Sequence, residues 1–156
     1  MKITFAVDIL CEPEEVFPWI AEPDKAMLWQ KGVKGGEIIK ETPEKIGTTF
    51  REEMEENGNS IEMNGVITDY IENKQISFHL ESKIHNVDVS YTIVGDKNKS
   101  TFTVVSTIYW KFPMNIISIF IGRKIKEDIL RQTKSEFAEL KRLCETNKAS
   151  VVPGTG

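Results

Sequence analysis

The chain has 156 residues, of which 40% are hydrophobic and 28% charged, and its formal net charge is −4. This length predicts one domain that can bury a core without disulfide or metal crosslinks. With Lys+Arg 20 against Asp+Glu 24, the chain lacks the positive excess that favours a nucleic-acid backbone, so we expect no nucleic-acid partner.

The start of the chain shows one strand pattern and then two helical ones. Apolar residues of one parity predict a strand with one buried face: Ile3, Phe5, Val7 and Ile9. Pro13 suits the first turn of a helix, beside two glutamates. A second short helix is predicted from Pro23 to about Trp29.

The middle of the chain, from residue 35 to about 110, has a hydrophobic period of two residues, which is typical of strands. Six strands are predicted, at 37–41, 47–55, 60–71, 75–83, 86–94 and 101–110. Short polar turns such as Asn57-Gly58-Asn59 join them. The sheet should therefore be antiparallel, because parallel pairing needs long crossovers.

A long amphipathic helix is predicted after Pro113. Its apolar residues recur mostly at steps of four and three: Ile117, Ile121, Ile125, Ile129 and Phe137, with Leu140 and Cys144 beyond. The charged residues between them, Glu136 included, are assigned to the solvated side, and Gly122 is a candidate site for a kink. We predict a single domain over residues 1–146 and a flexible C-terminal tail over 147–156.

Targeting signals are not evident in the sequence. The N-terminal apolar stretch contains Asp8 and has no small-residue cleavage site, and the longest apolar run is far short of the ~20 residues that cross a bilayer. Cys11 and Cys144 have no metal-like spacing, which favours two reduced thiols. We therefore expect a cytoplasmic protein.

Taken together, this order of elements resembles the START/SRPBCC superfamily of helix-grip proteins, particularly its polyketide cyclase/dehydrase and lipid-transport-like members. Five segments carry the resemblance: the opening strand into 11–20, then 23–29, 46–51, 65–78 and the closing helix. The resemblance implies an α+β helix-grip fold, with a seven-stranded curved antiparallel sheet wrapped around a long C-terminal helix and two short helices after the first strand. It also implies a deep, mostly apolar cavity between sheet and helix.

Strand parity and helix position predict the side chains that line this cavity. The strands contribute Phe50, Glu52, Met54, Phe78, Leu80, Val89, Tyr91, Val104, Ser106 and Ile108. The helix contributes Phe120, Ile121 and Ile125, and Trp29 is predicted to close an entrance. The inner face of 60–71 stays unassigned, because both of its parities are partly apolar. Ordinary core packing is the alternative interpretation for each of these residues.

Two of these residues are polar candidates for contact with a ligand. Glu52, if it faces the cavity unpaired, would have a raised pKa and the capacity to act as a general acid or base. The alternative is a carboxylate in water at the strand end. Tyr91 would donate its hydroxyl to a ligand carbonyl or to a core group. No catalytic residue is assigned.

Metal and cofactor chemistry find little support in the sequence. His79 is predicted to point outward and His85 to lie near a turn, without a third ligand beside them. Phosphate-binding glycine motifs, hydrolase motifs and iron–sulfur spacings are missing as well. We expect no metal and no cofactor.

The segment Ile116 to Ile121 has more apolar residues than one helix face can bury. Because Arg123, Lys124 and Lys126 follow it, one hypothesis is transient membrane contact during lipid exchange. The alternatives are burial beneath the two N-terminal helices or a homodimer contact.

These inferences favour one function over two others. The protein is expected to bind or transport a hydrophobic small molecule, such as a lipid, an isoprenoid or quinone, or a polyketide-like compound, and to be a ligand-binding protein rather than an enzyme. The alternatives are a polyketide cyclase/dehydrase-type enzyme that uses the same cavity and a co-chaperone-like protein-interaction module.

Overall fold

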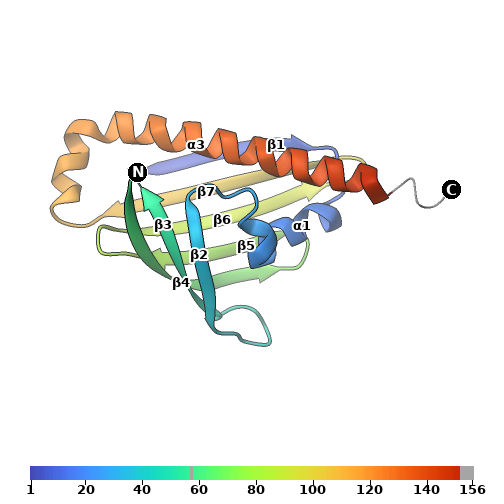
Figure 1. Cartoon of the computed structure of the whole chain (residues 1–156), viewed down its shortest axis with the longest axis horizontal. Helices are drawn as coiled ribbons and strands as arrows, with labels where there is room; N and C mark the ends of the chain where they lie inside the picture. The colour runs from blue at the N-terminus through green and yellow to red at the C-terminus, as the bar shows by residue number, and fades with distance from the viewer. Residues whose placement is uncertain (57, 152–156) are drawn as a thin grey trace.

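A seven-stranded antiparallel sheet curves around one long helix in the computed structural model, which describes residues 1–56 and 58–151 (Figure 1). The elements follow the predicted order: β1 (Lys2–Ile9), α1 (Pro13–Ala21), α2 (Pro23–Ala26), β2 (Val33–Lys40), β3 (Thr49–Glu56), β4 (Asn59–Ile71), β5 (Gln75–Glu81), β6 (His85–Gly95), β7 (Ser100–Trp110) and α3 (Met114–Val151). The strands are arranged β1-β7-β6-β5-β4-β3-β2. The predicted α+β helix-grip fold is confirmed.

Three element boundaries differ from the prediction by three residues or more. Helix α2 ends at Ala26, and β2 begins at Val33, earlier than expected. Helix α3 continues to Val151, so residues 147–151 of the predicted tail are helical. The rest of that tail, 152–156, lies outside the described residues.

Strand β4 contains the irregularity that hid its inner face from the sequence pattern. Its register with β5 shifts between Ile67 and Asp69. Before the shift, odd-numbered residues such as Met63 are buried. Beyond it, the even-numbered Tyr70 packs on Phe17, with ring centroids 5.6 Å apart. A bulge moves the following side chains to the other face, so both parities are apolar within one strand.

The core lies beneath the C-terminal half of α3. Phe137, Leu140 and Cys144 of the helix are buried there. The ring of Phe137 stacks on Phe102 of β7, with centroids 4.7 Å apart, and meets Phe5 of β1 edge-on at 5.3 Å. Helix α3 therefore packs on the β1–β7 side of the sheet through its second half.

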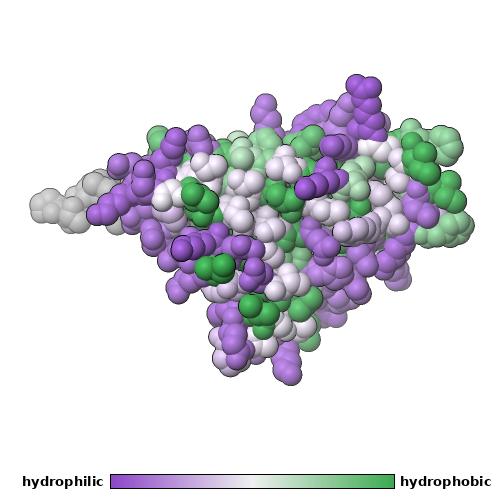
Figure 2. Space-filling view, turned by 180° about the vertical axis from the view of Figure 1, so that it is seen from behind, coloured by the Kyte–Doolittle hydropathy of each residue, from purple (hydrophilic) through white to green (hydrophobic). Residues whose placement is uncertain are grey.

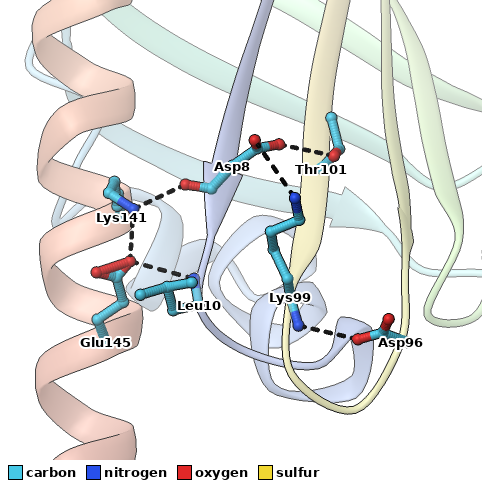
Figure 3. A network of polar contacts seen from close by, with 7 residues as sticks. All are labelled: Asp8, Leu10, Asp96, Lys99, Thr101, Lys141 and Glu145. Atoms are coloured by element: carbon cyan, nitrogen blue, oxygen red, sulfur yellow. Dashed lines mark hydrogen bonds and ion pairs between the residues drawn. The ribbon is translucent and has the colours of Figure 1, made fainter.

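Polar contacts fasten the same half of α3 to the end of β1 (Figure 3). Lys141 Nζ donates to the main-chain oxygen of Asp8 at 2.9 Å and pairs with Glu145 at 2.8 Å. Glu145 in turn accepts the Leu10 N–H at 3.2 Å, and the Asp8 carboxylate accepts the hydroxyl of Thr101 at 2.8 Å. These bonds fix the helix along the edge strand.

The N-terminal half of α3 has no comparable anchor. Helix α3 bends near its start, and its first turns lie at the opposite end of the molecule from α1 (Figure 1). Within the part of the chain that the structure describes, the fully buried helix residues begin only at Phe137. The first half of α3 therefore roofs the sheet without closing down on it.

Replacing Phe137 tests this division of α3. Phe137→Ala should lower the free energy of unfolding by about 3–5 kcal/mol, because it leaves a cavity among aromatic rings. Phe120→Ala is the matched control, since Phe120 is 83% exposed on the same helix and its truncation should change stability by less than ~0.5 kcal/mol. Urea unfolding followed by circular dichroism measures both, and equal losses would contradict the proposed anchor.

Candidate functional site

A cavity of about 630 Å³ lies between the first half of α3 and the inner face of the sheet. Its wall takes residues from all seven strands, from the segment after α2, and from α3. The volume falls within the ~300–1,000 Å³ typical of small-molecule pockets. The unanchored half of α3 thus covers an interior space that side chains leave open.

Most of the predicted lining residues surround this cavity. They are Glu52, Met54, Phe78, Leu80, Val89, Tyr91, Val104, Ser106, Ile108, Ile121 and Ile125. The strand residues among them face the cavity because the strands keep a regular pleat on the inner face. Their contact with a ligand stays a prediction.

Trp29 does not close an entrance, which corrects the prediction for this residue. It is 1% exposed, and its indole N–H donates to the Trp19 carbonyl at 2.8 Å. Its ring meets Phe102 and Phe137 edge-on, at 6.3 and 5.9 Å. Trp29 therefore belongs to the core beside the cavity, because α2 ends before reaching it and the chain turns inward.

Phe50 and Phe120 are also placed outside the cavity wall. The Phe50 ring lies directly over Gly65 of β4, so closely that a Cβ at that glycine would collide with it. This contact takes Phe50 away from the cavity space. Phe120 is 83% exposed and faces solvent, because the residues at this point of α3 point in several directions. It is not a roof residue.

Several lining residues were missed by the sequence analysis. Ile61 and Met63 of β4 lie in the wall, on the face that the bulge concealed. Ile129 follows Ile121 and Ile125 at helical spacing, so the periodicity of α3 contained the signal for it.

Glu52 is a carboxyl group without a local partner. It lies in the cavity wall at the middle of β3 and is partly buried. Its cross-strand neighbours, Gly36 and Met63, offer no polar side chain. Across residues 1–56 and 58–151, Glu52 forms no hydrogen bond or ion pair. Burial raises its pKa, because the charged form loses hydration and gains no compensating contact.

Tyr91 supplies a hydroxyl to the same cavity. Its oxygen accepts the Gln30 amide at 3.4 Å, a long contact, and its ring lies against Phe78 with centroids 5.3 Å apart. Burial raises the pKa of Tyr91, and the charges of Glu136 and Glu52 raise it further. The hydroxyl is therefore protonated at neutral pH and has a hydrogen to donate.

Glu136 corrects the assignment of the solvated helix face. It lines the cavity and accepts hydrogen bonds from the main-chain N–H groups of Lys31 and Gly32, at 3.1 and 3.4 Å, and from Gln132 at 2.9 Å. Burial raises its pKa in spite of these bonds. Glu136 thus holds the segment before β2 against α3.

Trp110 contributes a second donor to the cavity wall. Its indole N–H is buried and has no acceptor among the described residues. The ring lies beside His85, with centroids 5.1 Å apart. A buried donor without an acceptor is costly unless a water or a ligand satisfies it, so this group indicates a polar contact still to be made.

The two histidines have separate local roles. His79 lies on the outer face, as predicted, where Nδ1 is 2.6 Å from Asp88 and Nε2 is 3.4 Å from Glu81. His85 is buried and its Nδ1 is 3.0 Å from the Ser82 hydroxyl. They do not converge on one site.

A wider hollow of about 960 Å³ adjoins the cavity near β2 and β3 and shares Glu52, Ile61 and Ile84 with it. Charged side chains dominate its wall, and Arg51 forms an ion pair with Glu37 there. The hollow is suited to water and ions, whereas the cavity under α3 is suited to an apolar molecule.

Comparison with known proteins shows that the fold is similar to that of solved structures. No family model and no curated protein matches the sequence. Solved structures do match: a START superfamily protein from Mycobacterium smegmatis has a TM-score of 0.77 at 16% identity, covering 93% of this chain and 97% of that one. The Zhui aromatase/cyclase from a Streptomyces species has a TM-score of 0.78 at 9% identity, covering 93% of both chains. A protein from Thermus thermophilus has a TM-score of 0.77 at 11% identity, covering 94% of this chain and 99% of that one.

The burial of Glu52 predicts a pH-dependent stability difference. Because burial favours the neutral carboxyl, the charge on Glu52 opposes folding once the pH exceeds its raised pKa. Glu52→Gln should therefore unfold at higher temperature than wild type at pH 7–8, and this gain should shrink toward pH 4, where the carboxyl becomes mostly protonated in both states.

Thermal unfolding between pH 4 and 8 measures this difference. Glu44→Gln is the control, because Glu44 is exposed in the loop between β2 and β3 and its substitution should give no such pH-dependent gain. A constant difference between Glu52→Gln and wild type across the range would contradict the buried, unpaired carboxyl.

Proposed function

We propose that this protein reversibly binds a hydrophobic small molecule in the cavity under α3. The observation that carries the proposal is an apolar cavity whose wall contains polar groups without partners, namely Glu52 and the Trp110 indole, beside the Tyr91 hydroxyl. Apolar walls provide affinity and a few polar groups fix orientation in small-molecule sites. The shared fold with START/SRPBCC proteins is consistent with this function.

Burial of apolar surface supplies the driving force. A ligand that buries about 300 Å² of apolar surface would gain about 7 kcal/mol at ~25 cal/mol per Å². Lost translational and rotational freedom offsets several kcal/mol of that gain. Binding would therefore be moderate and reversible, as a carrier or receptor requires.

The polar groups restrict the chemistry of the ligand. Glu52, when ionised, accepts hydrogen bonds and suits a ligand hydroxyl. Tyr91 and Trp110 donate and suit carbonyl or ether oxygens. A lipid, an isoprenoid or quinone, and a polyketide-like compound share this chemistry, which is a long apolar body with a few oxygens. Among them, those that carry both a hydroxyl and a carbonyl match the wall best.

Filling the cavity tests this proposal. Ser106→Phe places a ring in the cavity and should weaken binding of the neutral fluorescent probe N-phenyl-1-naphthylamine at least about tenfold, because apolar volume is lost. Thr107→Phe, on the outer face of the same strand, is the matched control and should bind like wild type. Circular dichroism verifies that both variants fold, and equal probe affinity in all three proteins would refute the site.

A second candidate function is a cyclase-type enzyme, which the raised pKa of the unpaired Glu52 favours. In this mechanism Glu52 removes a proton from a carbon beside a ligand carbonyl, and the enolate attacks another carbonyl of the same molecule. Tyr91 protonates the new alkoxide and regains its proton from Glu52. The step is an isomerisation and needs no oxidant or cofactor.

Glu52→Gln distinguishes the two candidates. A carrier variant should keep probe affinity within a few-fold and release the same molecules as wild type when both are denatured and extracted from one host. An enzyme variant should instead release an uncyclised isomer that wild type does not contain. Mass spectrometry with chromatographic separation of isomers measures this difference.

The interaction-module alternative receives less support. It uses the outer surface and needs no interior space, whereas about 630 Å³ is open beneath α3. Cavities of this size are costly to maintain in a domain whose interior only has to pack.

A further inference from the structure

The first turns of α3 and Phe112 just before them present a group of exposed apolar side chains, which we name the apolar tip. It consists of Phe112, Ile116, Ile117, Ile119, Phe120 and Ile121. Ile119 and Phe120 are 77% and 83% exposed, so most of each side chain is in contact with solvent. Figure 2 shows apolar side chains gathered at this end of the molecule, opposite the C-terminal end of α3. Contiguous exposed apolar surface of this kind marks an interaction site.

No described part of the chain covers this surface. Burial beneath the two N-terminal helices was one expectation for the segment, and it is wrong, because α1 lies beside the other end of α3 (Figure 1). The partner must therefore come from outside the described residues.

Basic side chains surround the apolar tip. Lys111, Arg123, Lys124 and Lys126 are the only charged residues from 111 to 126. Arg123 pairs with Glu127 at 3.3 Å, and Lys111 donates to the main-chain oxygen of Ser82 at 2.7 Å. Lys124 and Lys126 form no ion pair within the ranges described. This local excess of positive charge stands against a net charge of −4 for the whole chain.

The apolar tip is continuous with the cavity wall. Met114 and Ile121 line the cavity, and Ile121, which is 46% exposed, is also a member of the tip. A surface that covers the tip would therefore adjoin one end of the cavity.

From these observations we propose that the apolar tip docks on an anionic lipid surface. The phenylalanine and isoleucine side chains enter the boundary between headgroups and acyl chains, and the basic residues contact lipid phosphates. No helix in the described part of the chain is long and apolar enough to span a bilayer, so the contact is peripheral. Resting on the proposed function, docking would let an apolar ligand pass between membrane and cavity without crossing water.

A second copy of this chain fits the tip less well. A two-fold dimer places the same patch on both sides of the interface. Four basic residues of one copy would then face four of the other, with Glu127 the acidic side chain closest along the helix. Such like-charge contacts oppose association, whereas anionic lipids neutralise them.

Vesicle flotation tests the proposal. Wild-type protein should float with vesicles of phosphatidylcholine and phosphatidylglycerol, and far less with phosphatidylcholine alone. Phe120→Asp and, independently, Ile119→Asp should each reduce the bound fraction about tenfold, because a charge opposes insertion. Lys124→Glu should reduce binding to the anionic vesicles only. Leu28→Asp is the matched control, since Leu28 is 60% exposed outside the tip and should bind like wild type.

Two results would overturn the docking proposal. One is wild-type protein that fails to float with anionic vesicles. The other is a dimer in analytical ultracentrifugation that Phe120→Asp converts to monomer, which would assign the tip to a second copy. Probe binding by N-phenyl-1-naphthylamine is measured in parallel. If wild-type protein binds the probe but does not float with anionic vesicles, docking alone is refuted. If it floats but does not bind the probe, the cavity function alone is refuted.

Discussion

The position of α3 depends on packing at one end of the helix, and the cavity depends on that asymmetry. Phe137, Leu140 and Cys144 fasten the second half to the sheet, with Lys141 bonded to β1. Polar side chains face the cavity in the preceding two turns: Asp128, Gln132, Thr133 and Glu136. Packing these groups against the apolar sheet would remove them from water without giving them hydrogen-bond partners, which costs free energy. The first half of the helix therefore stands away from the strands. The interior is open because only the second half of α3 can be buried against the sheet without leaving polar side chains unpartnered.

The two carboxyl groups in the cavity wall show how one environment yields different roles. Burial raises the pKa of both Glu52 and Glu136. Glu136 accepts three hydrogen bonds and holds the segment before β2 to the helix. Glu52 sits opposite Gly36 and Met63 and has none within the described residues. Glu136 therefore has a structural role, whereas the carboxyl of Glu52 is available to bind a ligand or a proton.

Much of the fold and part of the site could be predicted from the sequence, for physical reasons that particular residues illustrate. Alternation placed Val104, Ser106 and Ile108 on the inner face because β7 is regular on that side. It failed in β4, where a bulge changes the facing of side chains without changing their polarity. Contacts between residues far apart in the sequence could not be predicted either. An example is Phe50, whose ring position depends on Gly65 of the next strand. The same holds for Glu136. Its charge alone predicts a solvated side chain, but its carboxylate accepts hydrogen bonds from backbone N–H groups and lies in the cavity wall.

The likeness to solved structures, at 9–16% identity for those compared, concerns the arrangement of the backbone. A shared backbone provides a space between sheet and helix, and the chemistry of that space depends on side chains. Here the space contains an unpaired carboxyl, a protonated phenol and an indole donor without an acceptor among the residues described. An interior that only had to pack would gain stability by losing the carboxyl and the indole N–H, because both are expensive to bury without partners. Their presence beside the Tyr91 hydroxyl, around an open cavity, supports the proposed binding of an apolar molecule that carries a few oxygens.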